Sequence, residues 1–294
     1  MNNKDYVIKA VDEEAQVRIW IADTTNLTKE AKARHKASGL SAAVLGKVLT
    51  AAVMMASDLK NPEGVLTLKV KGDGAAGMIL ATADNRGKVR GFVSNPNING
   101  LRAERAAVKT GEIVGTAGIL EISKDLGMKQ PFSSRVELVS GEIDEDLVYY
   151  LKISEQIEAA VMLEVLLGQD MEIMTMGGII VQSLPQGRLE VFRTIEKNLT
   201  RLREMRMNFY KNSGKEILEA LTRGLNFEIL SALEAKFKCN CHRKRLLGII
   251  GGMSREDLNY SFKDKEEIEV LCNFCNTRYF FTREQIKAYR DSLH

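Results

Sequence analysis

The chain has 294 residues, 45% of them hydrophobic and 28% charged, and its 42 Lys and Arg against 39 Asp and Glu give a net charge of +3. This composition excludes an intrinsically disordered or collagen-like chain, and the length suits about two domains. The N-terminal residues lack the continuous apolar stretch of a secretory signal, and Lys47 interrupts the most apolar segment. We therefore expect a cytoplasmic protein with no membrane-spanning helix and no membrane partner.

Residues 1–182 alternate between strand and helix patterns. Stretches rich in β-branched and apolar residues predict strands at 17–21, 65–70, 77–82, 88–93, 115–122, 133–139, 161–167 and 179–182. Helices are predicted from Thr28, over 41–56 and over about 144–156. The polar turn with Gly87 makes 77–93 a hairpin. Hairpins mixed with helices predict an α+β core domain rather than a regular βαβ array.

Residues 72–77, Gly-Asp-Gly-Ala-Ala-Gly, match the G-x-G-x-x-G pattern of dinucleotide-binding loops. The following residues continue into the predicted hairpin, so no helix N-terminus is available to bind a pyrophosphate. The acidic residue expected about 20 positions later is also missing between Phe92 and Asn99. We therefore do not predict a dinucleotide site.

Residues 183–232 have an amphipathic, basic helical pattern. Apolar residues recur at spacings of three or four, at Leu189, Phe192, Ile195, Leu199, Leu202 and Met205. Shorter helical patterns follow at 216–221 and 227–233. The apolar stripe can pack on a core or bind a partner. Its position between two candidate domains suggests a helical linker.

All four cysteines lie in the last 56 residues, as Cys239-x-Cys241 and Cys272-x-x-Cys275 with 30 residues between the pairs. Four thiolates suit the tetrahedral coordination of Zn²⁺, and an iron-sulfur cluster is the competing interpretation. Strands are predicted around the second pair, at 267–271 and 279–281, and a capping box at 282–285 opens a terminal helix. We predict a zinc-binding domain over 233–294 with one Zn²⁺ per chain, folded with the metal and largely unfolded without it.

The sequence leaves open whether this site is inert or reactive. A disulfide across the one-residue spacing of Cys239 and Cys241 would close a small ring that is comparatively easy to reduce. Basic residues crowd the two pairs, at Lys236, Lys238, His242, Arg243, Lys244, Arg245 and Arg278. Their charge can favour thiolates, or only balance the −2 of a zinc tetrathiolate. Because four cysteines complete the tetrahedron, His242 is expected at the surface.

The two cysteine pairs and five further segments resemble the heat-shock protein of 33 kDa, a family of redox-regulated bacterial chaperones. Those segments are Arg34-His35, 91–96 (Gly-Phe-Val-Ser-Asn-Pro), 139–143 (Val-Ser-Gly-Glu-Ile), 154–156 (Ser-Glu-Gln) and Gly177-Gly178. The resemblance runs essentially from end to end, and all four cysteine positions are kept.

The resemblance implies an ATP-independent holdase, not an enzyme, that is inactive while reduced and zinc-bound. Oxidation would join Cys239 to Cys241 and Cys272 to Cys275, release zinc, and unfold the C-terminal domain and the linker. The active form would be a homodimer that binds unfolding client proteins. We expect Phe192, Ile195, Leu199, Leu202 and Met205 to form the client-binding stripe, because losing the zinc domain would remove packing from the linker.

Two other classes are weighed against this one. Residues 233–294 hold 12 Lys and Arg against 9 Asp and Glu, which the charge of a zinc tetrathiolate would reduce further, so a nucleic-acid-binding zinc ribbon is disfavoured. A thiol-disulfide oxidoreductase would place its Cys-x-x-Cys at the start of a helix, whereas a strand follows Cys275 here.

Overall fold

The computed structural model describes residues 4–12, 14, 16–98, 108–185, 187, 189–204, 209–263 and 265–292. The chain divides into two compact units, Met1–Lys238 and Cys239–His294, which are described separately below and called the body and the module. The predicted linker, 183–232, lies within the body in this division. The domain boundaries 1–182, 183–232 and 233–294 stay predictions.

One sheet of the body has five strands, all antiparallel to their neighbours. Their order across the sheet is β10 (Phe227–Glu234), β1 (Tyr6–Asp12), β2 (Val17–Asp23), β9 (Ile173–Ser183) and β8 (Ala159–Leu167). Strands β2, β8 and β9 follow the predicted apolar segments, although β9 begins six residues earlier than the expected 179–182. The N-terminal strand β1 was not predicted.

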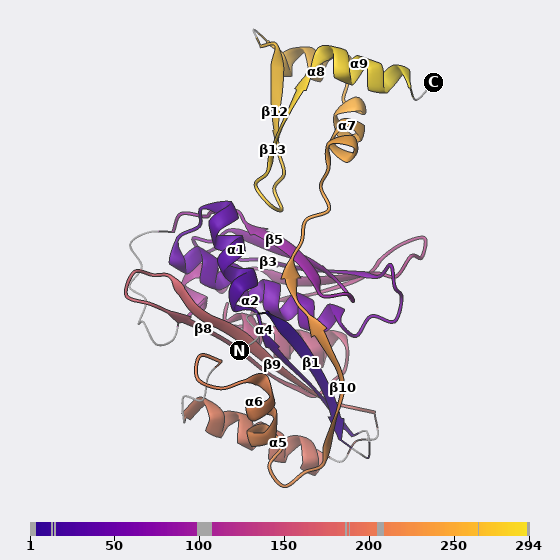
Figure 1. Ribbon diagram of the computed structural model, residues 1–294. Coiled ribbons are helices and arrows are strands. Elements are labelled where there is room, and N and C mark those ends of the chain that lie inside the picture. The colour runs from indigo at the N-terminus through magenta and orange to yellow at the C-terminus, as the bar shows by residue number, and fades with distance from the viewer. Residues whose placement is uncertain are drawn as a thin grey trace. The chain divides into compact units, whose positions relative to one another are not determined.

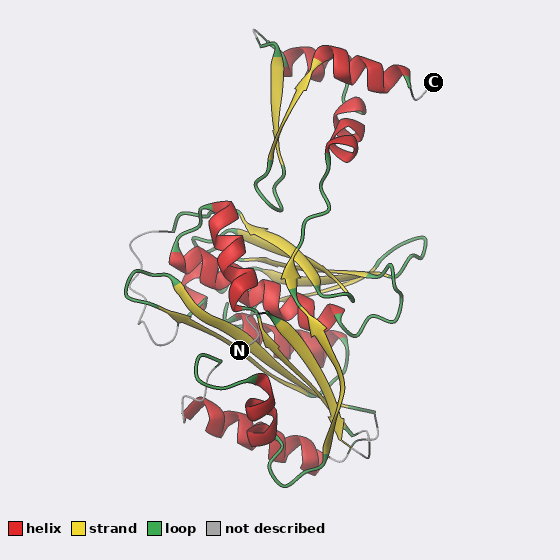
Figure 2. Cartoon of the chain, viewed as in Figure 1, coloured by secondary structure: helices red, strands yellow, loops and turns green. Residues whose placement is uncertain are grey.

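The second sheet of the body contains the predicted hairpin. Its order is β11 (Lys236–Phe237), β5 (Lys88–Val93), β4 (Met78–Asp84), β3 (Val65–Lys71), β6 (Ile119–Asp125) and β7 (Phe132–Glu137). The pairs are antiparallel except β11 with β5. Residues 72–77 join β3 to β4, so the glycine-rich segment leads into a strand as predicted. Figure 2 shows the mixture of helices and strands that makes the fold α+β.

The helix α2 (Gly39–Ala56) contacts strands of both sheets, and all of its residues except Met55 are buried. The predicted helix over 41–56, with Lys47 inside it, is confirmed. By length and composition this helix could cross a membrane, with a mean hydropathy of 1.7, although Lys47 was expected to leave the apolar segments too short. However, 94% of it is buried inside the fold, as in a core helix. Lys47 is accommodated because Glu142 and Asp144 lie 3.6 and 3.4 Å from its Nζ.

The body also contains the helices α1 (Thr25–His35), α3 (Gly111–Val114) and α4 (Ile143–Ser154). Helices α1 and α4 confirm the patterns that begin near residues 28 and 144.

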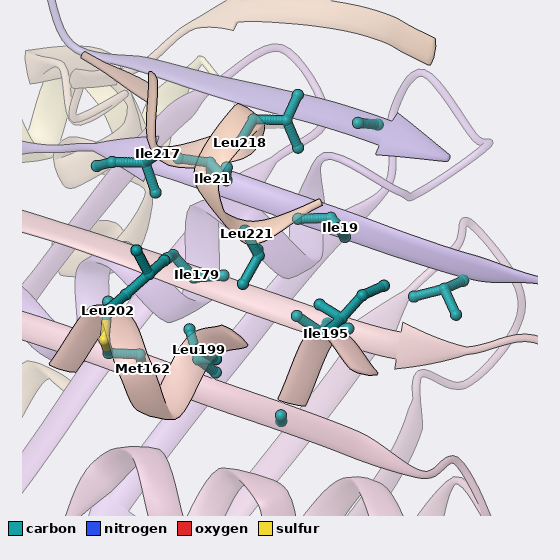
Figure 3. Close-up of a cluster of buried hydrophobic side chains, with 14 of the residues drawn as sticks. Ile19, Ile21, Met162, Ile179, Ile195, Leu199, Leu202, Ile217, Leu218 and Leu221 are labelled. Carbon is teal, nitrogen blue, oxygen red and sulfur yellow. The ribbon is translucent and has the colours of Figure 1, made fainter. Parts of the chain in front are cut away.

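The face of the five-stranded sheet opposite α2 is covered by α5 (Leu189–Glu204) and α6 (Gly214–Leu221) (Figure 1). Both helices were predicted. Figure 3 shows their side chains meeting Ile19, Ile21 and Ile179 of the sheet. The apolar stripe of α5 is therefore packed on a core.

The predicted helix at 227–233 is wrong, because these residues form the edge strand β10. Its pattern, Phe-Glu-Ile-Leu-Ser-Ala-Leu-Glu, has no clean period, so local sequence does not decide between helix and strand. Backbone pairing with β1, from Tyr6 opposite Glu234 to Asp12 opposite Phe227, decides for the strand. The expected linker is thus helical only in part.

The module contains the predicted strands β12 (Glu267–Leu271) and β13 (Arg278–Thr282), paired as an antiparallel hairpin. The capping box of Thr282 and Gln285 opens α9 (Arg283–Asp291), as predicted. Helices α7 (Arg243–Gly251) and α8 (Arg255–Ser261) were not predicted. Six buried side chains form the described core: Leu246, Ile250, Phe262, Ile268, Phe281 and Ile286.

Candidate metal centre

The four cysteines lie in two turns of the module. Cys239 and Cys241 occupy the segment before α7, and Cys272 and Cys275 occupy the turn between β12 and β13. His242 is exposed and caps α7, because its Nδ1 accepts a hydrogen bond from the backbone N–H of Arg245 at 3.2 Å. It thus lies at the surface, as expected for a residue outside the four-cysteine set.

Backbone hydrogen bonds shape the second turn. The N–H of Cys272 donates to the carbonyl of Thr277 at 3.0 Å, and the N–H groups of Cys275 and Asn276 donate to the carbonyl of Cys272 at 3.2 and 2.7 Å. Asn276 has a φ of 57°, in the left-handed region that Asn tolerates better than most residues. The closed turn keeps the two thiols near each other and leads directly into β13.

The two turns bring all four sulfur atoms within 4.8 Å of one another. Across the pairs, Cys239 Sγ lies 3.8 Å from Cys272 Sγ, and Cys241 Sγ lies 3.3 Å from Cys275 Sγ. Four sulfurs about 2.3 Å from a tetrahedral zinc ion are about 3.8 Å apart. All four cysteines are free thiols. The set therefore fits one metal ion held by four sulfur ligands.

Burial is the largest cause of the pKa shifts of two of these thiols, those of Cys241 and Cys272. It raises the pKa of Cys241, and it raises the pKa of Cys272 to about 12. Whether the basic residues favour thiolates or balance the charge of a metal tetrathiolate stays open, as it does from the sequence. Cys272 is buried, which removes water from the charged form of its thiol.

Two of the basic residues have other partners. The guanidinium of Arg243 lies 4.5 Å from the ring centre of Phe281, and Arg278 forms a 3.2 Å ion pair with Glu269. Sequence proximity to a cysteine therefore does not mean that the charge is directed at its sulfur.

Two residues beside the sulfurs were missed as site residues. Tyr279 Oη lies 3.3 Å from Cys241 Sγ and donates to the Cys241 carbonyl at 3.3 Å, and Thr277 Oγ1 lies 3.2 Å from Cys275 Sγ. The hydrogen bond to Cys241 and burial both raise the pKa of Tyr279. Their positions, two and four residues after Cys275, were the available signal, but Tyr279 was noted only as part of a strand.

The predicted client-binding residues are buried in the body. Phe192, Ile195, Leu199 and Leu202 are each at most 5% exposed, and they pack on the five-stranded sheet. Met205 lies outside the described residues. In this state, the four described side chains are not available to a partner.

The C-terminal end of α5 is held by polar contacts as well. Arg203 Nη2 donates to Asp144 Oδ2 at 3.1 Å and to the carbonyl of Val161 at 2.9 Å. Nearby, burial raises the pKa of Glu164 to about 7, and the charge of Arg203 opposes that shift.

An α+β body, a helical pair covering one sheet, and a small module whose four clustered thiols could hold a metal ion define a class of two-unit proteins. A family of this class matches the sequence. The model of the family described as "Hsp33 protein" matches residues 5–282, and the chain belongs to that family.

Curated relatives agree over nearly the whole chain. The "33 kDa chaperonin" of Bacillus licheniformis is 37% identical over 289 residues, which cover 98% of this chain and 100% of the relative. The protein of the same name from Desulforamulus reducens is 36% identical and covers 97% of this chain and 96% of its own.

A solved structure has the same fold over nearly the whole chain. The crystal structure of the 33 kDa chaperonin, a heat shock protein 33 homologue, from Thermotoga maritima has a TM-score of 0.89 with 30% identity and covers 99% of both chains. These comparisons confirm the resemblance and the α+β fold, and they place the chain in a chaperone family.

Proposed function

We propose that this protein is a redox-regulated, ATP-independent holdase that is inactive while reduced and becomes active when its four thiols are oxidised. In the reduced form Cys239, Cys241, Cys272 and Cys275 hold one Zn²⁺. The proposal places the protein in the cytoplasm, with unfolding proteins as its clients and a homodimer as its active form. The observation that carries it is that four free thiols share one site in the unit with the smaller core.

The proposed chemistry is the formation of two disulfides, Cys239–Cys241 and Cys272–Cys275. Each disulfide forms when two thiols lose two electrons and two protons, which one hydrogen peroxide takes up to become two waters. A fully oxidised chain therefore consumes two peroxides. Sulfurs bonded to each other no longer offer the four thiolates that a metal site of this kind needs.

The consequence for the module follows from its small core. Six buried apolar side chains form its described hydrophobic cluster, and a structural zinc ion typically contributes more than about 10 kcal/mol to folding. A unit of this size rarely has enough apolar burial to fold alone. Oxidation of the thiols therefore unfolds the module.

The proposed exposure of the predicted linker depends on the continuous chain that connects the module to α5. One residue, Lys238, separates β11 from Cys239. Two backbone hydrogen bonds hold β11 and this residue, from Lys236 N–H to the carbonyl of Gly87 at 2.9 Å and from Lys238 N–H to the carbonyl of Val89 at 2.8 Å. Unfolding of the module makes these end contacts easier to lose, and β10, α6 and α5 precede them along the chain. Release of α5 exposes Phe192, Ile195, Leu199, Leu202 and Met205, together with the sheet face that they cover.

The first experiment measures metal content, free thiols and suppression of client aggregation before and after peroxide treatment at an unfolding temperature. We expect metal loss, the disappearance of four thiols and the gain of holdase activity to occur together and to reverse with a dithiol reductant. If the metal stays and aggregation is unaffected, the site is structural and the proposal is wrong.

Hydrogen exchange tests the linker step separately. After oxidation, amides of 189–204 should exchange faster, while those of α2, buried in the body core, should not change. Unchanged exchange over 189–204 would contradict the exposure of the stripe.

A matched pair of variants tests client binding by the stripe. In the oxidised protein, Phe192→Ser should reduce client binding severalfold. Phe132→Ser, which removes a phenyl ring that is 57% exposed on β7, should not. Equal binding by both variants would show that clients bind elsewhere.

A further inference from the structure

The hydroxyl of Tyr279 lies beside two acceptors of one cysteine. Its Oη is 3.3 Å from Cys241 Sγ and 3.3 Å from the Cys241 carbonyl oxygen, although the two residues are 38 positions apart in the chain. Tyr279 belongs to β13, which follows the second cysteine pair, whereas Cys241 belongs to the first pair. The contact therefore joins the two turns of the four-thiol site through a residue that is not one of the four cysteines.

The ring that carries this hydroxyl is positioned by the core of the module. Tyr279 packs against the described hydrophobic cluster, and its ring is stacked with that of Phe281, at a centroid distance of 6.5 Å and an interplanar angle of 14°. Phe281 is 0% exposed. In the hairpin, Tyr279 lies opposite Val270, which packs against the same cluster. Packing of the ring thus fixes the position of the hydroxyl beside Cys241.

A phenol has one proton, so its hydroxyl makes one full hydrogen bond as a donor at a time. In the structure Cys241 is a free thiol, and Tyr279 donates to the Cys241 carbonyl. The S–H of Cys241 can then donate to Tyr279 Oη, and both protons are used. A cysteine that binds a metal ion has lost its proton, so its sulfur can only accept. A negatively charged sulfur is a stronger acceptor than a neutral carbonyl at the same distance.

We propose that Tyr279 is a positioning residue of the metal site, whose hydroxyl turns its hydrogen bond from the Cys241 carbonyl to the Cys241 sulfur when that sulfur becomes a thiolate ligand. The hydrogen bond is then stronger in the metal-bound form than in the metal-free form, so it stabilises the metal-bound form. This inference rests on the proposed function, because it concerns the same four thiols, and it adds a residue that regulates how tightly they hold the metal.

The same hydrogen bond slows the oxidation of Cys241. In the first step the thiolate attacks one oxygen of hydrogen peroxide, a sulfur–oxygen bond forms, the oxygen–oxygen bond breaks, and the leaving hydroxide takes up a proton to become water. In the second step the thiolate of Cys239 attacks the sulfur of the resulting sulfenic acid, the disulfide forms, and a second hydroxide leaves and is protonated. A sulfur that accepts a hydrogen bond is less basic, and the nucleophilicity of a thiolate falls with its basicity. Tyr279 therefore acts against the first step.

The test compares Tyr279→Phe, which keeps the ring and loses the hydroxyl, with Tyr260→Phe as the matched control. Tyr260 belongs to the same module, on α8, and is 79% exposed. Both variants are made in the full-length chain, which is loaded with Zn²⁺ or with Co²⁺ as a spectroscopic probe. Circular dichroism checks that the metal-saturated variants keep the fold of the parent.

Three measurements should change in Tyr279→Phe and stay at the parent values in Tyr260→Phe. The apparent metal affinity should fall about fivefold, the effect of losing one hydrogen bond of ordinary strength at a half-buried side chain. The rate of thiol loss in peroxide should rise about twofold, because nucleophilicity changes less than basicity does. The sulfur-to-cobalt charge-transfer band should move to longer wavelength, because a sulfur without the hydrogen bond gives up electron density more easily.

The band position separates this role from a purely structural one, since it is measured on the metal-saturated protein. If the affinity fell but the band stayed at the parent wavelength, the hydroxyl would only hold the Cys241 carbonyl, and the inference would be wrong. If Tyr279→Phe matched a parent that binds metal and loses it in peroxide, the inference alone would fail. A parent that binds no metal would overturn the proposed function and this inference together.

Discussion

In the body, α2 lies among strands of two sheets with all but one residue buried, whereas the module buries a described cluster of six apolar side chains and gathers four thiols within 4.8 Å. Apolar burial stabilises the body whatever the redox state, because it depends on no ligand. In the proposed function, a large share of the folding free energy of the module depends on four sulfur atoms and their chemical state. The same perturbation should therefore affect the two units very differently.

Metal removal should have the largest effect. Chelation, or Cys275→Ser, is expected to cost the module about 10 kcal/mol and to unfold it, because its apolar cluster is too small to replace the ligand. Amide resonances of 239–292 should collapse to random-coil positions while those of α2 stay in place. A module that keeps its dispersed resonances after complete metal loss would remove the contrast between the two units.

A substitution that leaves a cavity in the core of the body should destabilise the body and leave the metal affinity of the module unchanged. Leu49 of α2 is 0% exposed, so Leu49→Ala should lower the free energy of unfolding of the body by about 2–5 kcal/mol. Urea unfolding followed by Trp20 fluorescence measures this loss, and metal affinity should not change. The control is Ile153→Ala on the exposed side of α4, where Ile153 is 55% exposed and truncation should cost less than about 0.5 kcal/mol.

The pH dependence of the body should carry a contribution from Glu164. Its pKa of about 7 in the folded protein lies above the ordinary 4.5, so the folded state binds the proton more tightly than the unfolded state. The contribution to stability is present in full below pH 4.5 and is lost as the pH rises through 7.

Glu164→Gln should remove this dependence, because the amide is neutral throughout. Between pH 5 and 8 the parent should lose about 1 kcal/mol relative to the variant, a value reduced for screening because the carboxyl is only partly buried. Parallel urea titrations at several pH values measure the difference. Parallel stability curves for the two proteins would show that Glu164 is charged in both states.

The contrast between the units was partly predictable from local sequence. The spacing of Cys239, Cys241, Cys272 and Cys275 restricts where the sulfurs can go, and Thr282 with Gln285 defines a helix start by itself. The prediction that these thiols share one site needed no distant contact to be known. The raised pKa of Cys272 could not be predicted in this way, because the burial that causes it depends on the folded module rather than on neighbours in sequence.

Features that depend on distant pairing could not be predicted. Strand β10 is fixed by β1, whose residues precede it by more than 200 positions, and β11 pairs with β5 within the six-stranded sheet. In the sequence, Arg18 and Trp20 have the pattern of ordinary strand residues. They line a pocket together with residues as far away along the chain as Gln182, which local sequence does not indicate. Sequence patterns specify local structure and metal-ligand spacing, but edge strands and cavities arise from the assembled fold.

The smallest predicted effect compares two capping boxes, one in each unit. Ser213 and Glu216 cap α6 of the body, and Thr282 and Gln285 cap α9 of the module. Ser213→Ala and Thr282→Ala remove the same kind of hydrogen bond, so each should cost about 1 kcal/mol. In the body, that loss should appear as a lower urea midpoint with metal affinity unchanged.

In the module, the proposed function couples folding to metal binding, so the same loss should appear as an apparent metal affinity about fivefold lower. Competition with a chromogenic chelator measures that affinity in both variants. Glu216→Ala and Gln285→Ala, which remove the other half of each box, are the matched controls and should show the same partition with smaller effects. If Ser213→Ala also lowered metal affinity fivefold, the stability of the body would be coupled to the metal site, and the two units would not be energetically separate.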